Sequence, residues 1–313
     1  MRKNAFTMQL SRVAEILGTD YHGEDVLIEG VSTDTRTLQG GELFVALRGE
    51  NFDANDFAVS AIQQGASACL MEKAVSGVEN YIVVQDCRNA LAQLAKAWRA
   101  QFDIPVIAVT GSNGKTTVKE MIASILAQQG KVLATKGNLN NDIGVPLTIF
   151  RLNKQHDSAI IEMGANHPGE IAYLVDIANP DVGIVNNAAA AHLEGFGSLQ
   201  GVARTKGEMF TGLNSQATAV INIDDQFASL WNELAGTRNK IYFGLGEQAN
   251  VKATWEVNSA GSELTVSTPG QTFSVQLSLM HWQQSLHAAS SIFRSAPSKK
   301  ALKRYSQLKA VFS

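Results

Sequence analysis

The sequence has few of the features that would place a protein in a membrane, on nucleic acid or outside the cell. Only 18% of its 313 residues are charged, the formal net charge is −3, and the body of the chain holds no Lys/Arg cluster. Such a balance gives no basic field for nucleic acid. Since no apolar run approaches the length of a membrane span and no signal-peptide core follows the N-terminus, we expect a cytoplasmic protein without a membrane span.

Cysteine is scarce as well, with two in the chain. Cys69 and Cys87 both lie in apolar or helical surroundings, which predicts buried thiols in a reducing compartment rather than a disulfide. What the chain does have is 45% hydrophobic residues, enough at this length for two domains with sound cores. We find no internal repeat, and we expect a monomer.

Residues 1–84 predict a small α/β domain. Short helices are expected over 10–17 and 57–64, since Gly18 and Gly65 follow them as stop signals. Strands are expected at 26–28, 43–47, 68–71 and 81–84. A helix within 85–103, with its apolar residues on one side, is predicted to link this domain to the next.

Residues 104–279 alternate between strands and helices, which is typical of a mostly parallel sheet with helices on both faces. Strands are expected at 106–109, 131–134, 159–163, 182–185, 219–223 and 240–243. From 251 to 279 the period changes to two, which predicts a short antiparallel meander attached to that sheet. The predicted fold class is therefore α/β, with a central sheet that carries a P-loop.

A glycine-rich turn joins the first of these strands to a helix. The turn consists of Gly111, Ser112, Asn113, Gly114, Lys115, Thr116 and Thr117, and Gly130 is the expected C-cap of the helix. Unpaired N–H groups at a helix start, together with the helix dipole, form an anion site. Lys115 would then reach the β- and γ-phosphates of a nucleotide, and the Thr116 hydroxyl would ligate Mg²⁺.

The turn departs from the general phosphate-loop pattern, which places a glycine where this sequence has Val109. The alternative is an ordinary turn with a chance Lys-Thr pair. The flanking strand and helix favour the phosphate loop.

Ligands of open parallel sheets bind beyond the carboxyl ends of the strands. That rule groups further polar residues with Lys115, namely Asn138, Asn140, Asn141, Glu162 and residues 186–192. Glu162 is the most informative, because it ends a strand that reads as buried, where a lone carboxylate is costly unless an ion such as Mg²⁺ relieves it. Its alternative is a strand-end side chain facing solvent.

Other polar residues are more ambiguous. His192 is a metal ligand, a base or an ordinary loop histidine, and Mg²⁺ prefers oxygen. Lys206, on a predicted helix, reads from the residues alone as a surface lysine, and Asn222, Asp224 and Asp225 suit a turn as well as a site.

In the first domain, Ser32, Thr33, Asp34, Thr35 and Arg36 form a dense polar loop. Asp34 and Arg36 suit the hydroxyls and phosphates of a ligand. A capped turn with a solvated ion pair is the simpler interpretation.

Assembled, these motifs resemble those of the Mur ligases, the ATP-dependent amide-forming enzymes of peptidoglycan precursor synthesis, from the N-terminus to about residue 279. The segments that carry the resemblance are 32–36, 44–49, 51–53, 111–117, 137–146, 162–171 and 191–197. Those at 162–171 and 191–197 are similar to the branch of the family that adds D-alanyl-D-alanine. A sister branch of the folylpolyglutamate type fits 32–36 and 162–165 less well.

The resemblance implies a reaction in which ATP and Mg²⁺ drive the joining of D-alanyl-D-alanine to UDP-N-acetylmuramoyl-tripeptide through an acyl phosphate. It implies that 1–84 binds the UDP precursor through Ser32 to Arg36, and that 104–279 binds ATP, with Asn140 and Asn141 near the phosphate loop. It further implies that Thr116, Glu162 and His192 support the metal, and that Lys206 does so as a carbamate.

Family members carry a third, C-terminal Rossmann-like domain, and we find no counterpart to it. Near Met280 the family's Pro-Gly-x-His-Asn turn is replaced by unrelated residues, so that 280–313 reads as an aberrant tail. Because the third domain closes over the nucleotide in the family, we expect impaired turnover. The alternative is a non-catalytic remnant that binds nucleotide or UDP precursor.

Overall fold

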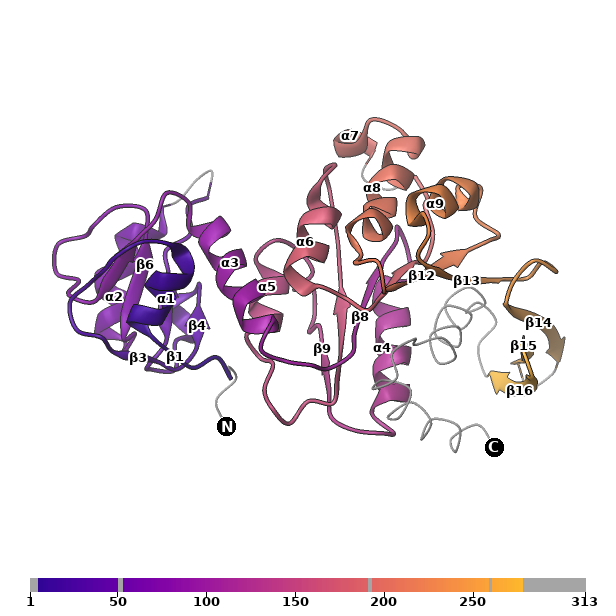
Figure 1. Cartoon of the computed structure of the whole chain (residues 1–313), viewed down its shortest axis with the longest axis horizontal. Coiled ribbons are helices and arrows are strands. Elements are labelled where there is room, and N and C mark those ends of the chain that lie inside the picture. The colour runs from indigo at the N-terminus through magenta and orange to yellow at the C-terminus, as the bar shows by residue number, and fades with distance from the viewer. Residues whose placement is uncertain (1–4, 50–52, 191–192, 259–260, 278–313) are drawn as a thin grey trace. The chain divides into compact units, whose positions relative to one another are not determined.

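The computed structural model of the chain describes residues 5–49, 53–190, 193–258 and 261–277. Two compact units are present (Figure 1), the first built from residues up to Asp103 together with Lys136–His156, and the second from Ile104–Thr135 and from Asp157 onward. The tail predicted at 280–313 lies outside the described residues.

The first unit is a small α/β domain. Its five-stranded sheet has the order β2-β7-β6-β5-β4 and is parallel except for β2 against β7, and β1 and β3 form a separate antiparallel pair. Its elements are β1 (Met8–Gln9), α1 (Leu10–Leu17), β2 (Tyr21–His22), β3 (Leu27–Ile28), β4 (Val31–Ser32), η1 (Thr35–Thr37), β5 (Leu43–Val45), η2 (Ala54–Phe57), α2 (Ala58–Gln63), β6 (Ala68–Met71), β7 (Tyr81–Val83), α3 (Cys87–Arg99) and α5 (Gly144–Ile149).

Local signals account for the helices of this unit. Gly18 closes α1 in the left-handed conformation with φ 64°, and Asp86 caps α3 by accepting the N–H groups of Arg88 and Asn89. Cys69 and Cys87 are buried free thiols, as predicted.

Residues 136–156, expected as part of the central domain, pack within the first unit. The Trp98 indole N–H donates to the Leu152 carbonyl at 3.2 Å, and the Phe6 N–H donates to the Phe150 carbonyl at 3.1 Å. The Phe6 ring lies 5.1 Å from Trp98 and 5.0 Å from Phe150 between ring centroids. This aromatic packing ties the excursion to α3 and to the start of the chain.

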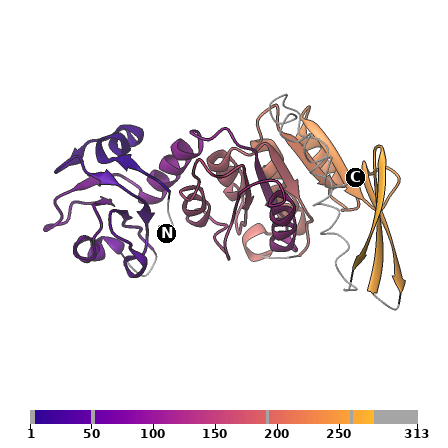
Figure 2. The same ribbon diagram turned by 90° about the horizontal axis from the view of Figure 1, so that it is seen from below.

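The second unit contains a nine-stranded sheet of order β16-β15-β14-β13-β12-β11-β8-β10-β9, parallel from β9 to β14 and antiparallel from β14 to β16. Its elements are β8 (Val106–Thr110), α4 (Lys115–Leu126), β9 (Val132–Ala134), β10 (Ser158–Glu162), α6 (Glu170–Ala178), β11 (Val182–Val185), α7 (Leu193–Phe196), α8 (Leu199–Gly212), β12 (Thr218–Asn222), α9 (Ala228–Ala235), β13 (Asn239–Gly244), β14 (Val251–Asn258), β15 (Gly261–Thr268) and β16 (Gln271–Leu277). The predicted meander is confirmed, and its long strands are orange to yellow in Figure 2.

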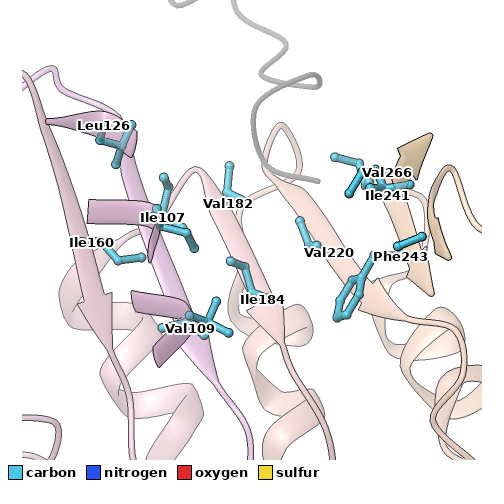
Figure 3. Close-up of a cluster of buried hydrophobic side chains, with 14 of the residues drawn as sticks. Ile107, Val109, Leu126, Ile160, Val182, Ile184, Val220, Ile241, Phe243 and Val266 are labelled. Carbon is cyan, nitrogen blue, oxygen red and sulfur yellow. The ribbon is translucent and has the colours of Figure 1, made fainter. Parts of the chain in front are cut away.

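Both faces of the parallel strands are covered. Alternate residues such as Ile107, Ile160 and Ile184 pack with the apolar side of α4 in one continuous cluster (Figure 3). On the opposite face Gly183 lets Met209 of α8 approach, since a Cβ there would lie 2.9 Å from its Cγ. Burial on both faces explains why these strands read as unbroken apolar runs.

One predicted helix end is wrong. Helix α4 ends at Leu126 with Ala127 as C-cap, and Gly130 is not in the left-handed conformation. Gly130 instead makes room for Asp157, whose Oδ2 would lie 2.4 Å from a Cβ at that position and accepts the Lys131 N–H at 2.9 Å. The glycine therefore serves a close approach rather than a helix stop.

We expect Ile107→Ala to lower the free energy of unfolding by about 3 kcal/mol, because it leaves a cavity between β8 and α4. Ile125→Ala, at a half-buried position packed against the same cluster, should cost clearly less. Urea unfolding followed by circular dichroism measures both. Equal losses would contradict the difference in burial between the two side chains.

Candidate functional site

The predicted phosphate loop begins directly after β8 and contains two glycines. Gly111 adopts φ +151°, and a Cβ there would lie 3.0 Å from the Asn186 Cβ and 3.2 Å from the Asn187 nitrogen. Gly114 is the N-cap of α4, in the left-handed region with φ 75°. Both positions therefore require glycine, and the N-terminus of α4 opens onto the loop.

Lys115 is held over this loop. Its Nζ donates to the Gly111 carbonyl at 2.8 Å and to the Ser112 carbonyl at 3.3 Å. Burial lowers the pKa of the Lys115 ammonium, and the Glu162 carboxylate opposes that shift. Thr116, next in the helix, is exposed, and Thr117 is half-buried.

Glu162 lies at the carboxyl end of β10, where it is 2% exposed and paired in register with Val109 of β8. Its N–H donates to the Thr135 hydroxyl at 3.0 Å. It shares a face of the strand with Ile160, which packs against α4. The solvent-facing alternative is therefore wrong.

Lys206 is not a surface lysine. It is 3% exposed on α8, and its Nζ lies 5.4 Å from the centroid of the Phe196 ring. Burial, helped by the charge of Lys115, lowers the pKa of Lys206 to about 8 against the pull of Glu170 and Glu208. Helix periodicity alone does not reveal this burial, because it depends on the elements that pack against α8, which are α6, α7, α9 and β11.

The structure thus brings Lys115, Glu162 and Lys206 into one electrostatic neighbourhood, from three separate elements. The charge of Lys115 interacts with that of Glu162, and the charge of Lys206 interacts with that of Lys115. A polyphosphate is the kind of ligand that a buried ammonium group, a half-buried one and a helix N-terminus attract.

Residues 186–189, which we term the Asn186 segment, hold the phosphate loop in shape. The Asn187 carbonyl and Oδ1 accept the N–H groups of Ser112 and Asn113 at 3.0 and 2.9 Å. The amides of Asn186 and Asn187 donate to the Asn113 carbonyl at 2.8 and 3.2 Å. The Ser112 hydroxyl donates to the Ala189 carbonyl at 3.1 Å and accepts the Ala189 N–H at 2.9 Å.

Sequence reasoning placed 186–192 near the loop but missed this supporting role. The signal that could have revealed it is the Asn-Asn pair that directly follows a buried strand. Asn222, Asp224 and Asp225 do form a turn, since the Asp224 N–H donates to Asn222 Oδ1 at 3.1 Å and the Phe227 N–H to Asp225 Oδ1 at 2.9 Å.

Asn138, Asn140 and Asn141 belong to the first unit. There Asn141 Oδ1 accepts the Gly144 N–H at 2.9 Å at the start of α5. A nucleotide role for Asn140 and Asn141 stays a prediction, as does the role of His192, which lies outside the described residues.

The Ser32–Arg36 loop is a capped turn with an ion pair. Asp34 caps η1 through the Arg36 N–H, and its carboxylate accepts the Arg36 guanidinium at 2.9 Å to Oδ1 and 2.8 Å to Oδ2. Hydrogen bonds from Arg36 lower the pKa of Asp34. Ser32 is buried and accepts the Asp34 N–H at 3.3 Å. The turn presents Arg36, with a largely exposed side chain, to solvent.

The donors near the loop suit a hard cation. Glu162 is a buried carboxylate and Thr116 a hydroxyl, which are the oxygen ligands that Mg²⁺ prefers. Within the described ranges no three His, Cys, Asp or Glu side chains surround one point, so phosphate oxygens would complete such a site. No helix in the described part of the chain is long and apolar enough to cross a membrane.

Comparison with known proteins identifies the class. A profile of the Mur ligase middle domain matches residues 109–289, and one of the Mur ligase family catalytic domain matches residues 27–99. The chain therefore belongs to the Mur ligase family.

Within that family the chain is similar to MurF. It is 46% identical over 276 residues to UDP-N-acetylmuramoyl-tripeptide--D-alanyl-D-alanine ligase of Escherichia coli K12, covering 87% of this chain and 61% of that protein. MurF from Acinetobacter baumannii superposes with a TM-score of 0.87 at 34% identity, over 92% of this chain and 65% of the other. MurF from Thermotoga maritima, solved with ADP, gives 0.75 at 31% identity, over 83% and 61%. The chain thus spans about 61% of the length of the curated relative.

The lowered pKa of Lys206 predicts a pH effect on stability. Since it lies near 8 in the fold and at 10.5 ordinarily, the unfolded chain binds more protons between these values, and stability rises with pH there. We expect wild type to gain up to about 3 kcal/mol relative to Lys206→Met from pH 8 to pH 10.5. Urea unfolding at both pH values measures the difference, and a difference independent of pH would contradict the assignment.

Proposed function

We propose that this chain takes part in the ATP-dependent joining of D-alanyl-D-alanine to UDP-N-acetylmuramoyl-tripeptide. The observation that carries the proposal is the phosphate loop with Lys115 held over it and Glu162 buried nearby. The chain is also similar to enzymes named UDP-N-acetylmuramoyl-tripeptide--D-alanyl-D-alanine ligase. The chain spans about 61% of the E. coli relative. That this chain carries out the complete reaction of the relative is therefore itself proposed.

The chemistry follows from the charges at the loop. The terminal carboxylate of the tripeptide attacks the γ-phosphorus of ATP, ADP leaves, and an acyl phosphate forms. The amine of D-alanyl-D-alanine then attacks the acyl carbon, an amide bond forms, and phosphate leaves with loss of the amine proton. Lys115 and the N–H groups at the start of α4 neutralise charge on the phosphoryl group as it is transferred.

Magnesium, when bound, would neutralise phosphate charge and hold the phosphates in one geometry. Thr116 and Glu162 offer the oxygen ligands for it, and His192 joins them by family resemblance. Lys206 joins as a carbamate: its neutral amine adds to the carbon of CO₂, a proton is released, and a cation becomes an oxygen ligand. Burial of Lys206, which favours the neutral amine, supports this role.

The first unit would bind the UDP precursor through Ser32, Thr33, Asp34, Thr35 and Arg36. The exposed guanidinium of Arg36 is suited to a diphosphate, and the Asp34 carboxylate holds it in place. The cytoplasm is the proposed location, with which two free buried thiols agree.

Nucleotide titration tests the loop. We expect the purified chain to bind MgADP and the imido analogue of ATP, and Lys115→Ala to weaken both at least tenfold, the analogue more because Lys115 reaches the γ-phosphate. Lys131→Ala is the matched control, because Lys131 is an exposed lysine directly before β9. No binding to wild type by calorimetry at millimolar nucleotide would reject the function.

Titration with UDP-N-acetylmuramoyl-tripeptide tests the first unit. Arg36→Ala should weaken binding about tenfold, since a charged hydrogen-bond partner of the diphosphate is removed. Arg12→Ala removes an exposed, ion-paired arginine of the same unit and should leave the affinity unchanged. Equal effects of the two variants would exclude the Ser32–Arg36 loop as the precursor site.

Turnover separates a ligase from a chain that only binds. A ligase releases phosphate only when both UDP-N-acetylmuramoyl-tripeptide and D-alanyl-D-alanine accompany MgATP. Binding of both ligands without such release would reduce the function to nucleotide and precursor binding.

A further inference from the structure

We propose that Asn222 and Asp225, at the end of β12, are positioning residues for the phosphate loop. They hold the Asn186 segment, and the Asn186 segment in turn holds the loop. The inference rests on the proposed binding of nucleotide at residues 111–117 and extends that site by one strand, to residues that neither the motif nor the family resemblance singles out.

The Asn186 segment is hydrogen-bonded to the loop on one side. Because Asn187 takes up the N–H groups of Ser112 and Asn113, these two groups are used to shape the loop. The N–H groups from Gly114 onward, at the start of α4, are those that the helix geometry leaves for a phosphate. The direction of those groups therefore depends on where Asn187 lies.

On its other side, the Asn186 segment is hydrogen-bonded to Asn222 and Asp225. The Asn222 amide donates to the Asn186 carbonyl at 2.9 Å, with both residues buried. The Asp225 carboxylate accepts the Ala188 N–H at 2.9 Å through Oδ2. These two bonds grip the segment at alternate residues, one through a carbonyl and one through an N–H.

Asn222 and Asp225 are themselves held in place by further hydrogen bonds. Asn222 Oδ1 also accepts the Asp224 N–H, and Asp225 Oδ1 also accepts the Phe227 N–H. Asp224 in turn accepts the Leu245 N–H at 2.6 Å, at the end of β13. The anchors are thus fixed by the turn between β12 and α9 and by the next strand of the sheet.

The order of the sheet makes their action indirect. Strand β11 lies between β12 and β8, so Asn222 and Asp225 act on the loop through the segment that follows β11. The chemistry of each side chain is also specific. Asn222 donates to a carbonyl and accepts an N–H, which requires an amide, whereas Asp225 accepts two N–H groups, which a carboxylate does best.

Isosteric substitutions separate this role from packing. Asn222→Asp keeps the acceptor but replaces the donor, so that an oxygen faces the Asn186 carbonyl. Asp225→Asn leaves one acceptor for two N–H groups. Matched controls make the same exchanges elsewhere. Asn214→Asp changes an exposed residue between α8 and β12, where Oδ1 accepts the Gln216 N–H, and Asp86→Asn changes the N-cap of α3.

The experiment is calorimetric titration of the full chain with MgADP, together with thermal unfolding without ligand and titration with UDP. We expect Asn222→Asp and Asp225→Asn to weaken MgADP binding about tenfold, as loss of outer supporting groups does at metal sites. UDP affinity should stay unchanged. The controls should bind both ligands within twofold of wild type.

A second measurement keeps the proposal testable if the buried Asn222→Asp chain fails to fold. Ser112 and Asp225 hold the neighbouring residues Ala189 and Ala188 of one segment. The double variant Ser112→Ala/Asp225→Asn should therefore weaken MgADP binding by less than the product of the two single effects. Ser112→Ala combined with Asp86→Asn should show no such coupling.

Wild-type affinity in a folded Asp225→Asn chain would overturn the proposal, as would fully multiplicative effects in the double variant. A loss of UDP affinity equal to the loss of MgADP affinity would also overturn it, because it would indicate general unfolding. If wild type itself binds no MgADP, the nucleotide function fails and this inference fails with it. Normal binding by wild type, loss in Lys115→Ala and no loss in Asp225→Asn would reject this inference alone.

Discussion

Three parallel strands, β10, β8 and β11, end side by side, and hydrogen bonds from the Asn186 segment fix the shape of the loop at that edge of the sheet. A loop with glycine at 111 and 114 has little conformational preference of its own. Ordering the loop costs backbone entropy. Hydrogen bonds from the amides of Asn186 and Asn187, which follow the neighbouring strand β11, offset part of that cost. These bonds shape the loop without a ligand, as the proposed binding of a phosphate at the start of α4 requires.

The same edge of the sheet holds charged groups whose burial costs stability. Burial lowers the pKa of Lys115 and of Lys206, and their mutual repulsion adds to the shift on Lys206. A buried carboxylate at Glu162 opposes part of this cost for Lys115. Such groups destabilise a core that could hold apolar residues instead. A bound polyphosphate would offset part of this cost by pairing with the two ammonium groups.

The first unit and the second obey the same local rules with different results. In the first, Asp34 satisfies the start of η1 and pairs with Arg36 in solvent, so the turn is stable without a ligand. In the second, the carboxyl ends of the strands gather polar groups that a solvated turn does not need. A capped turn with a solvated ion pair therefore describes the polar loop of the first unit. In the second unit, the corresponding alternative of a solvent-facing Glu162 does not describe the structure.

Much of this protein follows from its sequence alone. The apolar runs at 68–71 and 182–185 coincide with β6 and β11, the glycine at 18 ends α1, and the change of period after residue 250 marks the antiparallel strands. These features are local, because a strand, a cap or a glycine turn depends on the residues within a few positions of it. The strand–loop–helix order around Lys115 is local in the same sense, and so is the family resemblance that its motif carries.

Tertiary structure decided what depends on distant residues. Lys206 is polar in a helix that reads as half-exposed, and only the surrounding elements bury it. Residues 136–156 join the first unit because Trp98 and Phe6 bond and pack against them, and Gly130 meets Asp157 rather than ending a helix. Likewise Asn222 and Asp225 read as a turn, and their bonds to the Asn186 segment exist only because the sheet places β12 beside β11. Burial and hydrogen-bond partners across strands are set by the order of the sheet, which no short stretch of sequence contains.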